Sequence, residues 1–104
     1  MTRAGAPVRI VLPAALRELA GIGGEVAVAL TGAPTQRGLL DALEATYPVL
    51  GGTIRDRNSA RRRPFLRFFV GDEDRSLDDP DDPLPESVVS GREPFVVLGA
   101  IAGG

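Results

Sequence analysis

Apolar residues that recur at every second position are the first signal in this sequence, and they predict its strands. Every second residue of 8–12 is a large aliphatic one, which is typical of a half-buried strand. A weaker alternation over 25–30 and a dense apolar run over 65–70 predict two more strands. Residues 73–76, which follow a Gly-Asp turn, are predicted to form a short edge strand. The β-branched run at 95–98 is predicted to be the last strand. The pattern therefore predicts a sheet of four to five strands.

A spacing of three and four residues predicts one main helix, which runs from Thr35 to Tyr47 and is followed by a proline. Leu39, Leu43 and Tyr47 recur on one face of this helix, as expected for packing on a sheet. Thr35 is a good N-cap residue. Gly38 weakens the first turn by about 1 kcal/mol relative to alanine, so we expect it to allow close packing or a late helix start.

Two shorter segments have weaker signals. Residues 14–20 predict a short helical turn with Leu16 and Leu19 on one face, and Gly21 is placed to stop it. Residues 88–91 are predicted to be a turn that leads into the last strand.

The order of these elements predicts an α+β fold in a single domain over residues 1–104. The strands at 8–12 and 25–30 would form an antiparallel pair, and the main helix would cross back over the sheet. The strand at 95–98 would pair beside the first strand, inside a mixed sheet packed on one main helix. Residues 99–104 would then form a flexible tail that projects from one edge of the sheet.

The composition excludes most familiar active sites. The chain has neither His nor Cys, which removes Ser-His and Cys-His nucleophilic sites, disulfides and nearly all structural zinc sites. All 12 basic residues are Arg, so Schiff-base and P-loop lysine chemistry are excluded as well. No apolar run approaches the roughly 20 residues that span a bilayer, and no signal peptide is recognisable. We expect a cytoplasmic carrier or substrate protein rather than an enzyme, without a bound metal or cofactor.

The sequence ends in Gly103-Gly104, a few residues after the last predicted strand. Two glycines have almost no bulk and adopt backbone angles that other residues avoid, so such an end can enter a channel too narrow for side chains. This favours the hypothesis that the C-terminal carboxylate of Gly104 is the reactive group. The alternative is that the two glycines are simply a frayed end.

Residues 51–64 are rich in arginine and include the run Arg61, Arg62 and Arg63. Such a run is either a docking site for an acidic partner or nucleic acid, or a solvated loop. We favour the solvated loop. No aromatic residues are interleaved with the arginines, and the chain has a net charge of -2, so nucleic-acid binding is not expected.

The segment from 77 to 85 is rich in aspartate and proline. An acidic cluster raises the question of calcium. Its spacing does not match the helix-flanked calcium loop, which needs a central Gly and a distal Glu. We therefore expect a solvated loop that faces the arginine-rich segment.

Several stretches of the sequence together resemble the MoaD/ThiS family of sulfur-carrier proteins, which have the ubiquitin-like β-grasp fold. They are VRIVLP (8–13) with LREL (16–19), LLDALEATYP (39–48), LRFFVGDED (66–74) and AIAGG (100–104). The last stretch is the most specific, because its position and its composition must both match. The chain departs from the family at GREP (91–94) and at Gly99, and its segment 51–64 is longer than in compact members. That length is similar to the CysO-like members, which serve cysteine synthesis.

The resemblance implies a mechanism and a set of partners. An E1-like adenylyltransferase would activate the carboxylate of Gly104 with ATP and magnesium, both held by the enzyme. Sulfide equivalents would then displace AMP and leave a thiocarboxylate on the glycine. The acceptor would be the large subunit of molybdopterin synthase, a thiazole synthase or a cysteine synthase, and the departures leave this choice open.

The resemblance also implies where partners bind. The tail would be recognised at Ile101, Ala102 and Gly103. The body would offer an apolar part of the sheet, for which Phe68 and Phe69 are candidates, although at least one of them is expected in the core. The arginines at 61–63 are further candidates for the partner surface.

Two other functional classes remain open at this stage. The chain could be a protein modifier that is joined through Gly104 to lysines of other proteins. It could also be a non-covalent β-grasp binding module with an incidental Gly-Gly end, for which the arginine-rich segment is the support.

Overall fold

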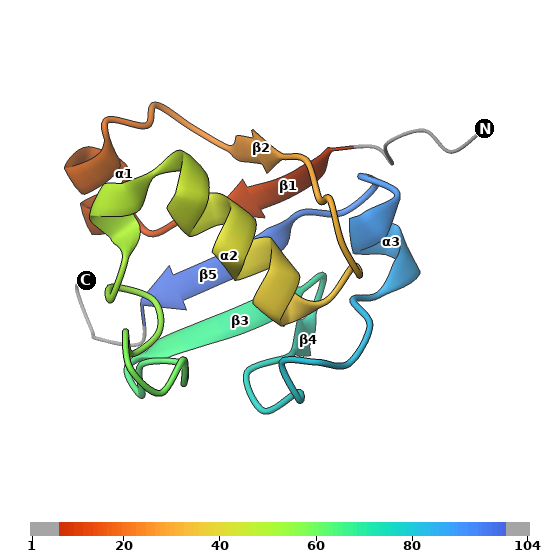
Figure 1. Ribbon diagram of the computed structural model, residues 1–104. Helices are drawn as coiled ribbons and strands as arrows, with labels where there is room; N and C mark the ends of the chain where they lie inside the picture. The colour runs from red at the N-terminus through yellow and green to blue at the C-terminus, as the bar shows by residue number, and fades with distance from the viewer. Residues whose placement is uncertain (1–6, 100–104) are drawn as a thin grey trace.

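The computed structural model describes residues 7–99 and places five strands in one mixed sheet (Figure 1). The strands are β1 (Val8–Val11), β2 (Val26–Val28), β3 (Leu66–Val70), β4 (Glu73–Asp74) and β5 (Phe95–Gly99). Their spatial order is β2-β1-β5-β3-β4. β5 is parallel to β1 and antiparallel to β3, and the outer pairs are antiparallel. The last strand of the chain is therefore the central strand of the sheet, as the sequence predicted.

One face of the sheet carries the main helix. The helical segments are α1 (Ala14–Ala20), α2 (Gln36–Thr46), the 3-10 turn η1 (Pro48–Leu50) and α3 (Glu86–Val89). Figure 1 shows α2 crossing the sheet, with α1 and α3 at opposite ends of the molecule. This arrangement confirms the predicted α+β fold with one main helix packed on a mixed sheet.

The start of α2 is fixed by its cap and by a glycine. The Oγ1 atom of Thr35 accepts a hydrogen bond from the backbone N–H of Gly38 at 3.1 Å, which confirms the predicted N-cap. A Cβ atom on Gly38 would lie only 2.9 Å from the backbone oxygen of Ala33. Gly38 therefore permits close packing of the preceding loop, which is one of the two roles expected from the sequence.

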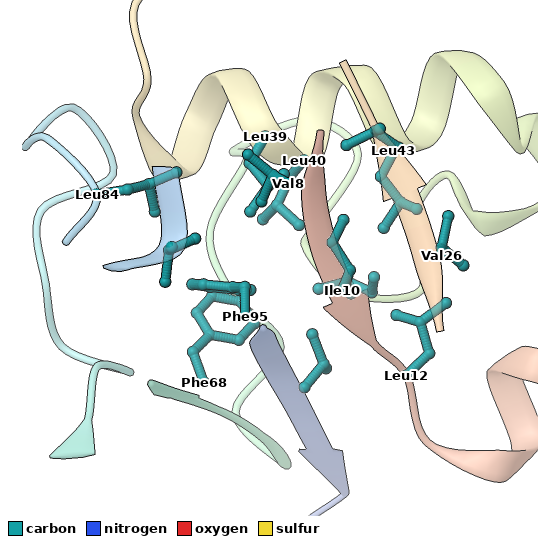
Figure 2. Close-up of a cluster of buried hydrophobic side chains, with 14 of the residues drawn as sticks. Val8, Ile10, Leu12, Val26, Leu39, Leu40, Leu43, Phe68, Leu84 and Phe95 are labelled. Atoms are coloured by element: carbon teal, nitrogen blue, oxygen red, sulfur yellow. The ribbon is translucent and has the colours of Figure 1, made fainter. Parts of the chain in front are cut away.

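The core lies between α2 and the sheet (Figure 2). Leu39, Leu40 and Leu43 extend from α2 toward β1 and β5 and are fully buried. The rings of Phe68 on β3 and Phe95 on β5 meet with centroids 5.1 Å apart and planes tilted by 51°, a geometry that aromatic pairs favour. The core residues of the strands alternate with more exposed ones, so the sheet has a second, open face.

Three local predictions need correction. Residues 88–91 are not a simple turn, because Val88 and Val89 belong to the short helix α3, whose N-cap residue is Pro85. The second strand is limited to Val26–Val28. In α1, Leu16 packs against the core, but Leu19 is 51% exposed, so the two do not share a buried face.

The connection from α2 to β3, which includes residues 51–64, is more closely packed against the core than the sequence indicated. Leu50 and Ile54 are fully buried and anchor this connection to the core. Within it, the carboxylate of Asp56 accepts hydrogen bonds from the backbone N–H groups of Asn58 and Ser59, each at 2.8 Å. Residues 51–64 therefore form a compact loop rather than a loosely solvated one.

Candidate functional site

β5 carries the chain toward its proposed reactive end. Gly99 closes this strand and lies opposite Leu66 in the antiparallel ladder with β3. Hydrogen bonding on both sides to β1 and β3 fixes the direction in which the strand leaves the sheet. The predicted reactive residue Gly104 and the predicted recognition residues Ile101, Ala102 and Gly103 lie outside the described residues.

The open face of the sheet presents an apolar row beside this strand. Val96 on β5 is the ladder partner of Val11 on β1 and of Phe69 on β3. Because side chains alternate between the two faces of a sheet, these three project away from α2. Leu98, one step further toward the end of β5, is 45% exposed on the same face. We call these four residues (Val11, Phe69, Val96 and Leu98) the open-face patch.

Ion pairs flank the open-face patch on both sides. On the β3 side, the guanidinium of Arg67 donates to the carboxylate of Asp74 at 3.0 Å. On the β1 side, Arg9 binds Glu25 through two hydrogen bonds of 3.0 and 3.1 Å and also donates to the backbone oxygen of Gly91. An apolar centre with a polar rim is the usual arrangement of a protein-binding surface.

These rim contacts shift the pKa values of the acidic groups. The hydrogen bond from Arg9 lowers the pKa of Glu25 below its usual value. Hydrogen bonds from Ser76, with a further contribution from Arg67, lower the pKa of Asp74. Both carboxylates are therefore ionised at neutral pH and keep the rim charged.

The two phenylalanines proposed from the sequence for partner binding differ in burial. Phe68 is fully buried in the core, so it is removed from the candidate surface. Its neighbour Phe69 is half-buried on the open face. The reason is the pleat of β3, which sends consecutive side chains to opposite faces.

The arginine run is mostly occupied by internal contacts. Arg62 donates from its Nε to the backbone oxygen of Ser76 at 3.0 Å, and Arg63 donates twice to the backbone oxygen of Gly52, at 2.9 and 2.7 Å. Arg61 is exposed. Of the three arginines proposed as a partner surface, Arg62 and Arg63 thus satisfy backbone carbonyls of the protein itself.

Arg55 lies in the same segment, and its side chain is buried although the sequence predicted a solvated loop here. Its side chain is only 10% exposed and binds the carboxylates of Glu44, at 2.9 Å, and Asp41 on α2. Burial acts to lower the pKa of Arg55, but the bonds to Glu44 and Asp41 outweigh it and raise the pKa. This arginine joins the loop to the helix and is a structural residue.

The aspartate-rich segment pairs with other parts of the molecule. Asp81 accepts two hydrogen bonds from Arg37 at the start of α2, at 2.6 and 3.1 Å. Asp78 lies 3.3 Å from Arg75. These ion pairs of residues 77–85 therefore go to α2 and to the β4 connection, rather than to the arginine run.

Neither a metal cluster nor a membrane-spanning helix is found in the part of the chain that the structure describes. Between residues 7 and 99, no group of three or more acidic, His or Cys side chains is arranged to hold a metal ion. The helices over the same residues are too short or too polar to cross a bilayer.

Sequence reasoning missed Val11, Val96 and Leu98 as surface residues. The strand predicted over 8–12 assigns Val11 no role, and the strand predicted over 95–98 does not distinguish the two faces of the run. The alternation within β1 and β5 contains the signal that would have found them, since Val8, Ile10, Phe95 and Val97 occupy the core positions.

No family model matches this chain, and no curated protein matches it in sequence. Solved structures, by contrast, match over nearly its whole length.

The structure is similar to small archaeal modifier protein 1 (SAMP1) from Haloferax volcanii, with a TM-score of 0.70 at 20% identity, covering 94% of this chain and 99% of that one. It is also similar to a chain in the crystal structure of the Amycolatopsis orientalis BexX/CysO complex, with a TM-score of 0.69 at 21% identity, covering 93% and 99%. SAMP1 from Methanosarcina acetivorans gives a TM-score of 0.64 at 18% identity, covering 99% and 100%.

At sequence identities of 18–21%, the similarity to these structures shows the fold of this chain. The matches cover 93–99% of this chain and 99–100% of each neighbour, so the similarity extends over almost the whole length of both. We conclude that this chain has the ubiquitin-like β-grasp fold predicted from its sequence, and that it shares this fold with SAMP1 and with the matched chain of the BexX/CysO complex.

Proposed function

We propose that this protein is a sulfur carrier and that the carboxylate of Gly104 carries the sulfur. The observation that supports this most directly is the position of β5. The strand that precedes the Gly-Gly end is the central strand of the sheet and is held by β1 and β3. A rigid strand of this kind gives a short, bulk-free end a defined starting point on the body.

The chemistry requires activation by a partner, because an ionised carboxylate is a poor electrophile. An E1-like enzyme transfers AMP from ATP to the Gly104 carboxylate and releases pyrophosphate. A sulfide equivalent then attacks the acyl carbon, the bond to AMP breaks, and AMP leaves with the displaced oxygen. The product is a thiocarboxylate on Gly104, and ATP and magnesium remain with the enzyme throughout.

The open-face patch supplies a docking surface for that enzyme. Val96 and Leu98 lie on β5, the last strand before the Gly-Gly end. Phe69 lies on β3, which pairs with β5. An enzyme that binds this patch would hold the body while the tail enters its active site. The charged rim formed by Arg67 and Asp74 would then fix the orientation.

Intact mass spectrometry tests the proposal. The protein is incubated with its activating enzyme, ATP, magnesium and a sulfide donor. The expected product is heavier by the difference between one sulfur and one oxygen atom, and omission of ATP should abolish the change. A single unmodified mass in the complete reaction would contradict the proposal. Incubating the modified protein with each of the three acceptor types then identifies the pathway.

A second function is favoured by the likeness to SAMP1, whose name describes a modifier protein. In that case the activated Gly104 carboxylate would form an isopeptide bond with lysines of other proteins. The chain has no lysine, so it could not extend such conjugates through its own side chains. A ladder of larger species that contain this protein in host extracts, lost when Gly104 is deleted, would favour the modifier over the carrier.

A further inference from the structure

A small cavity lies between the start of α2 and the aspartate-rich segment. Its lining consists of Gln36 on α2, Arg75 after β4, Phe95 on β5 and six residues of the aspartate-rich segment. The cavity has a volume of about 10 Å³. A single water molecule needs roughly 10–15 Å³ of such space, so this cavity has room for one water and for nothing larger.

Arg75 brings an unpaired hydrogen-bond donor to this cavity. Its two terminal nitrogens donate to Glu73 at 2.6 Å and to Asp78 at 3.3 Å. Its Nε atom is buried without a hydrogen-bond partner, and it is the only buried side-chain nitrogen or oxygen between residues 7 and 99 in that state. Because an unsatisfied buried donor destabilises a fold, such a group indicates a bound water or ion.

Gln36 brings a second polar group from a distant part of the chain. The residue is only 8% exposed, although it is the first residue of α2. The hydrogen bonds at this helix start are made by its neighbours, since Thr35 accepts from Gly38 and Arg37 donates to Asp81. Within residues 7–99, the side-chain amide of Gln36 takes part in none of them. This amide offers both an acceptor and two donors to the cavity.

The chemistry of the lining selects the occupant. The Nε–H group of Arg75 donates, so the occupant must present an acceptor atom, which a bare metal cation lacks. An anion would lie beside the carboxylates of Asp78, Asp79 and Asp82, which line the same cavity and repel it. A water molecule accepts from Nε, carries no charge and still has two protons to donate.

We propose that one resident water molecule occupies this cavity, accepts a hydrogen bond from Nε of Arg75 and bonds to the side-chain amide of Gln36. A bridging water is nearly as favourable in enthalpy as a direct hydrogen bond. Two direct contacts run beside it, because Arg37 donates from its backbone N–H to the oxygen of Pro80 at 2.9 Å and from its side chain to Asp81. The water is therefore a third connection between α2 and the aspartate-rich segment.

The same connection reaches the rim of the open-face patch. Arg75 directly follows Asp74, the rim residue that pairs with Arg67. With Nε bonded to the water, all three nitrogens of the Arg75 guanidinium have partners. The side chain is then held in one position, and it fixes the chain between Glu73 and Asp78.

NMR detection of long-lived water tests the proposal. The chain has one glutamine, Gln36, and one asparagine, Asn58, so its side-chain amides give only two pairs of proton signals. We expect nuclear Overhauser effects to water, of the sign that long-lived waters give, at the Gln36 amide and at the Nε proton of Arg75. Asn58 is exposed and should show only short-lived surface water, which makes it the internal control.

Gln36→Met is the matched variant, because methionine keeps the length of the side chain and removes its polar group. The water signal at the Arg75 Nε proton should then be lost. Thr46→Met, at the exposed far end of α2, is the control and should leave that signal unchanged. Should Gln36→Met fail to fold, the signals of the unmodified protein still decide the question.

Three results would overturn the inference. The first is water contact at Gln36 and Arg75 that is as short-lived as at Asn58. The second is a direct Overhauser effect between the Arg75 Nε proton and the Gln36 amide, which would show that these groups close over the cavity. The third is a shift of the Gln36 amide when calcium is added at constant ionic strength, which would assign the cavity to a cation. All three are read without the activating enzyme, so they are independent of the mass measurement that tests the thiocarboxylate.

Discussion

The Nε atom of Arg55 lies 2.9 Å from the carboxylate of Glu44, and this pair joins the loop after η1 to the exposed side of α2. The arginine side chain is 10% exposed and that of Glu44 22%. Asp41, one turn earlier on the helix, binds the same guanidinium. An arginine-rich loop that the sequence presents as solvated is thus held to the helix by one buried residue.

Arg55→Met should lower the free energy of unfolding by about 2 kcal/mol, because it keeps the aliphatic stem but removes hydrogen bonds to two charged groups. Arg55→Lys should recover only part of this loss, since an ammonium group cannot make the same forked contact. Urea unfolding measures both changes. Arg57→Met, at an exposed neighbour, is the control and should change stability by no more than about 0.5 kcal/mol. Equal stability of Arg55→Met and the unmodified protein would exclude this role.

Gly38→Ala should destabilise the protein although alanine is the better helix former. The substitution gains about 1 kcal/mol of helix propensity, but its Cβ would lie 2.9 Å from the Ala33 backbone oxygen. Relieving such overpacking costs about 1–3 kcal/mol, so the net effect should be a lower melting temperature. Gly24→Ala has no neighbour within 4 Å and should not lower it. A melting temperature raised by Gly38→Ala would show that the loop moves away freely.

Asp74 should contribute to acid sensitivity. Bonds from Ser76 and Arg67 hold its pKa below the ordinary value of 3.8. A depressed carboxyl pKa stabilises the fold above the unfolded value, and this contribution disappears as the pH falls through the folded value. Asp74→Asn should therefore melt at a lower temperature than the unmodified protein at pH 7, and the difference should narrow below about pH 4. Asp72→Asn, in the adjacent turn, is the control, and a pH-independent difference at Asp74 would rule out the charge as the cause.

Phe69→Ser should weaken binding of the activating enzyme while leaving the fold intact, because Phe69 is half-buried on the open face and is the aromatic residue of the open-face patch. Loss of an aromatic anchor typically costs an interface about 2 kcal/mol or more, which corresponds to roughly a thirtyfold increase in the dissociation constant. Leu77→Ser provides a matched control, since Leu77 is 89% exposed and lies in the aspartate-rich segment. Titration calorimetry measures both, and equal losses would remove the patch as the docking site.

Changes at the end of the chain should affect activation and not stability. Addition of one residue after Gly104, or Gly104→Ala, should sharply reduce ATP–pyrophosphate exchange by the activating enzyme, because the carboxylate is displaced or gains bulk. The melting temperature should stay unchanged, since Gly104 follows the last residue of β5, Gly99, by five positions in the sequence. Undiminished exchange with the extended protein would show that the enzyme does not use this carboxylate.

Local pattern was enough to predict much of this fold. The alternation in β1, the leucine spacing of α2, the Thr35 cap and the apolar runs of β3 and β5 are signals carried by neighbouring residues. Their order along the chain then favoured one α+β arrangement, with the last strand beside the first. The absence of His, Cys and Lys, and the candidate role of Gly104, also come from the sequence alone.

Only the tertiary structure decided which side chains are exposed for contact with a partner and which are buried or bonded within the protein. The pleat of β3 buries Phe68 and leaves Phe69 on the open face, and no local signal ranks one above the other. Arg55 and Arg62 look alike in the sequence as surface charges, but each finds oxygen acceptors on segments distant in the chain. A small apolar hollow lined by Leu16, Leu66 and Gly99 likewise forms where β3, β5 and the start of α1 meet. Such features depend on contacts between distant segments, which a linear pattern cannot encode.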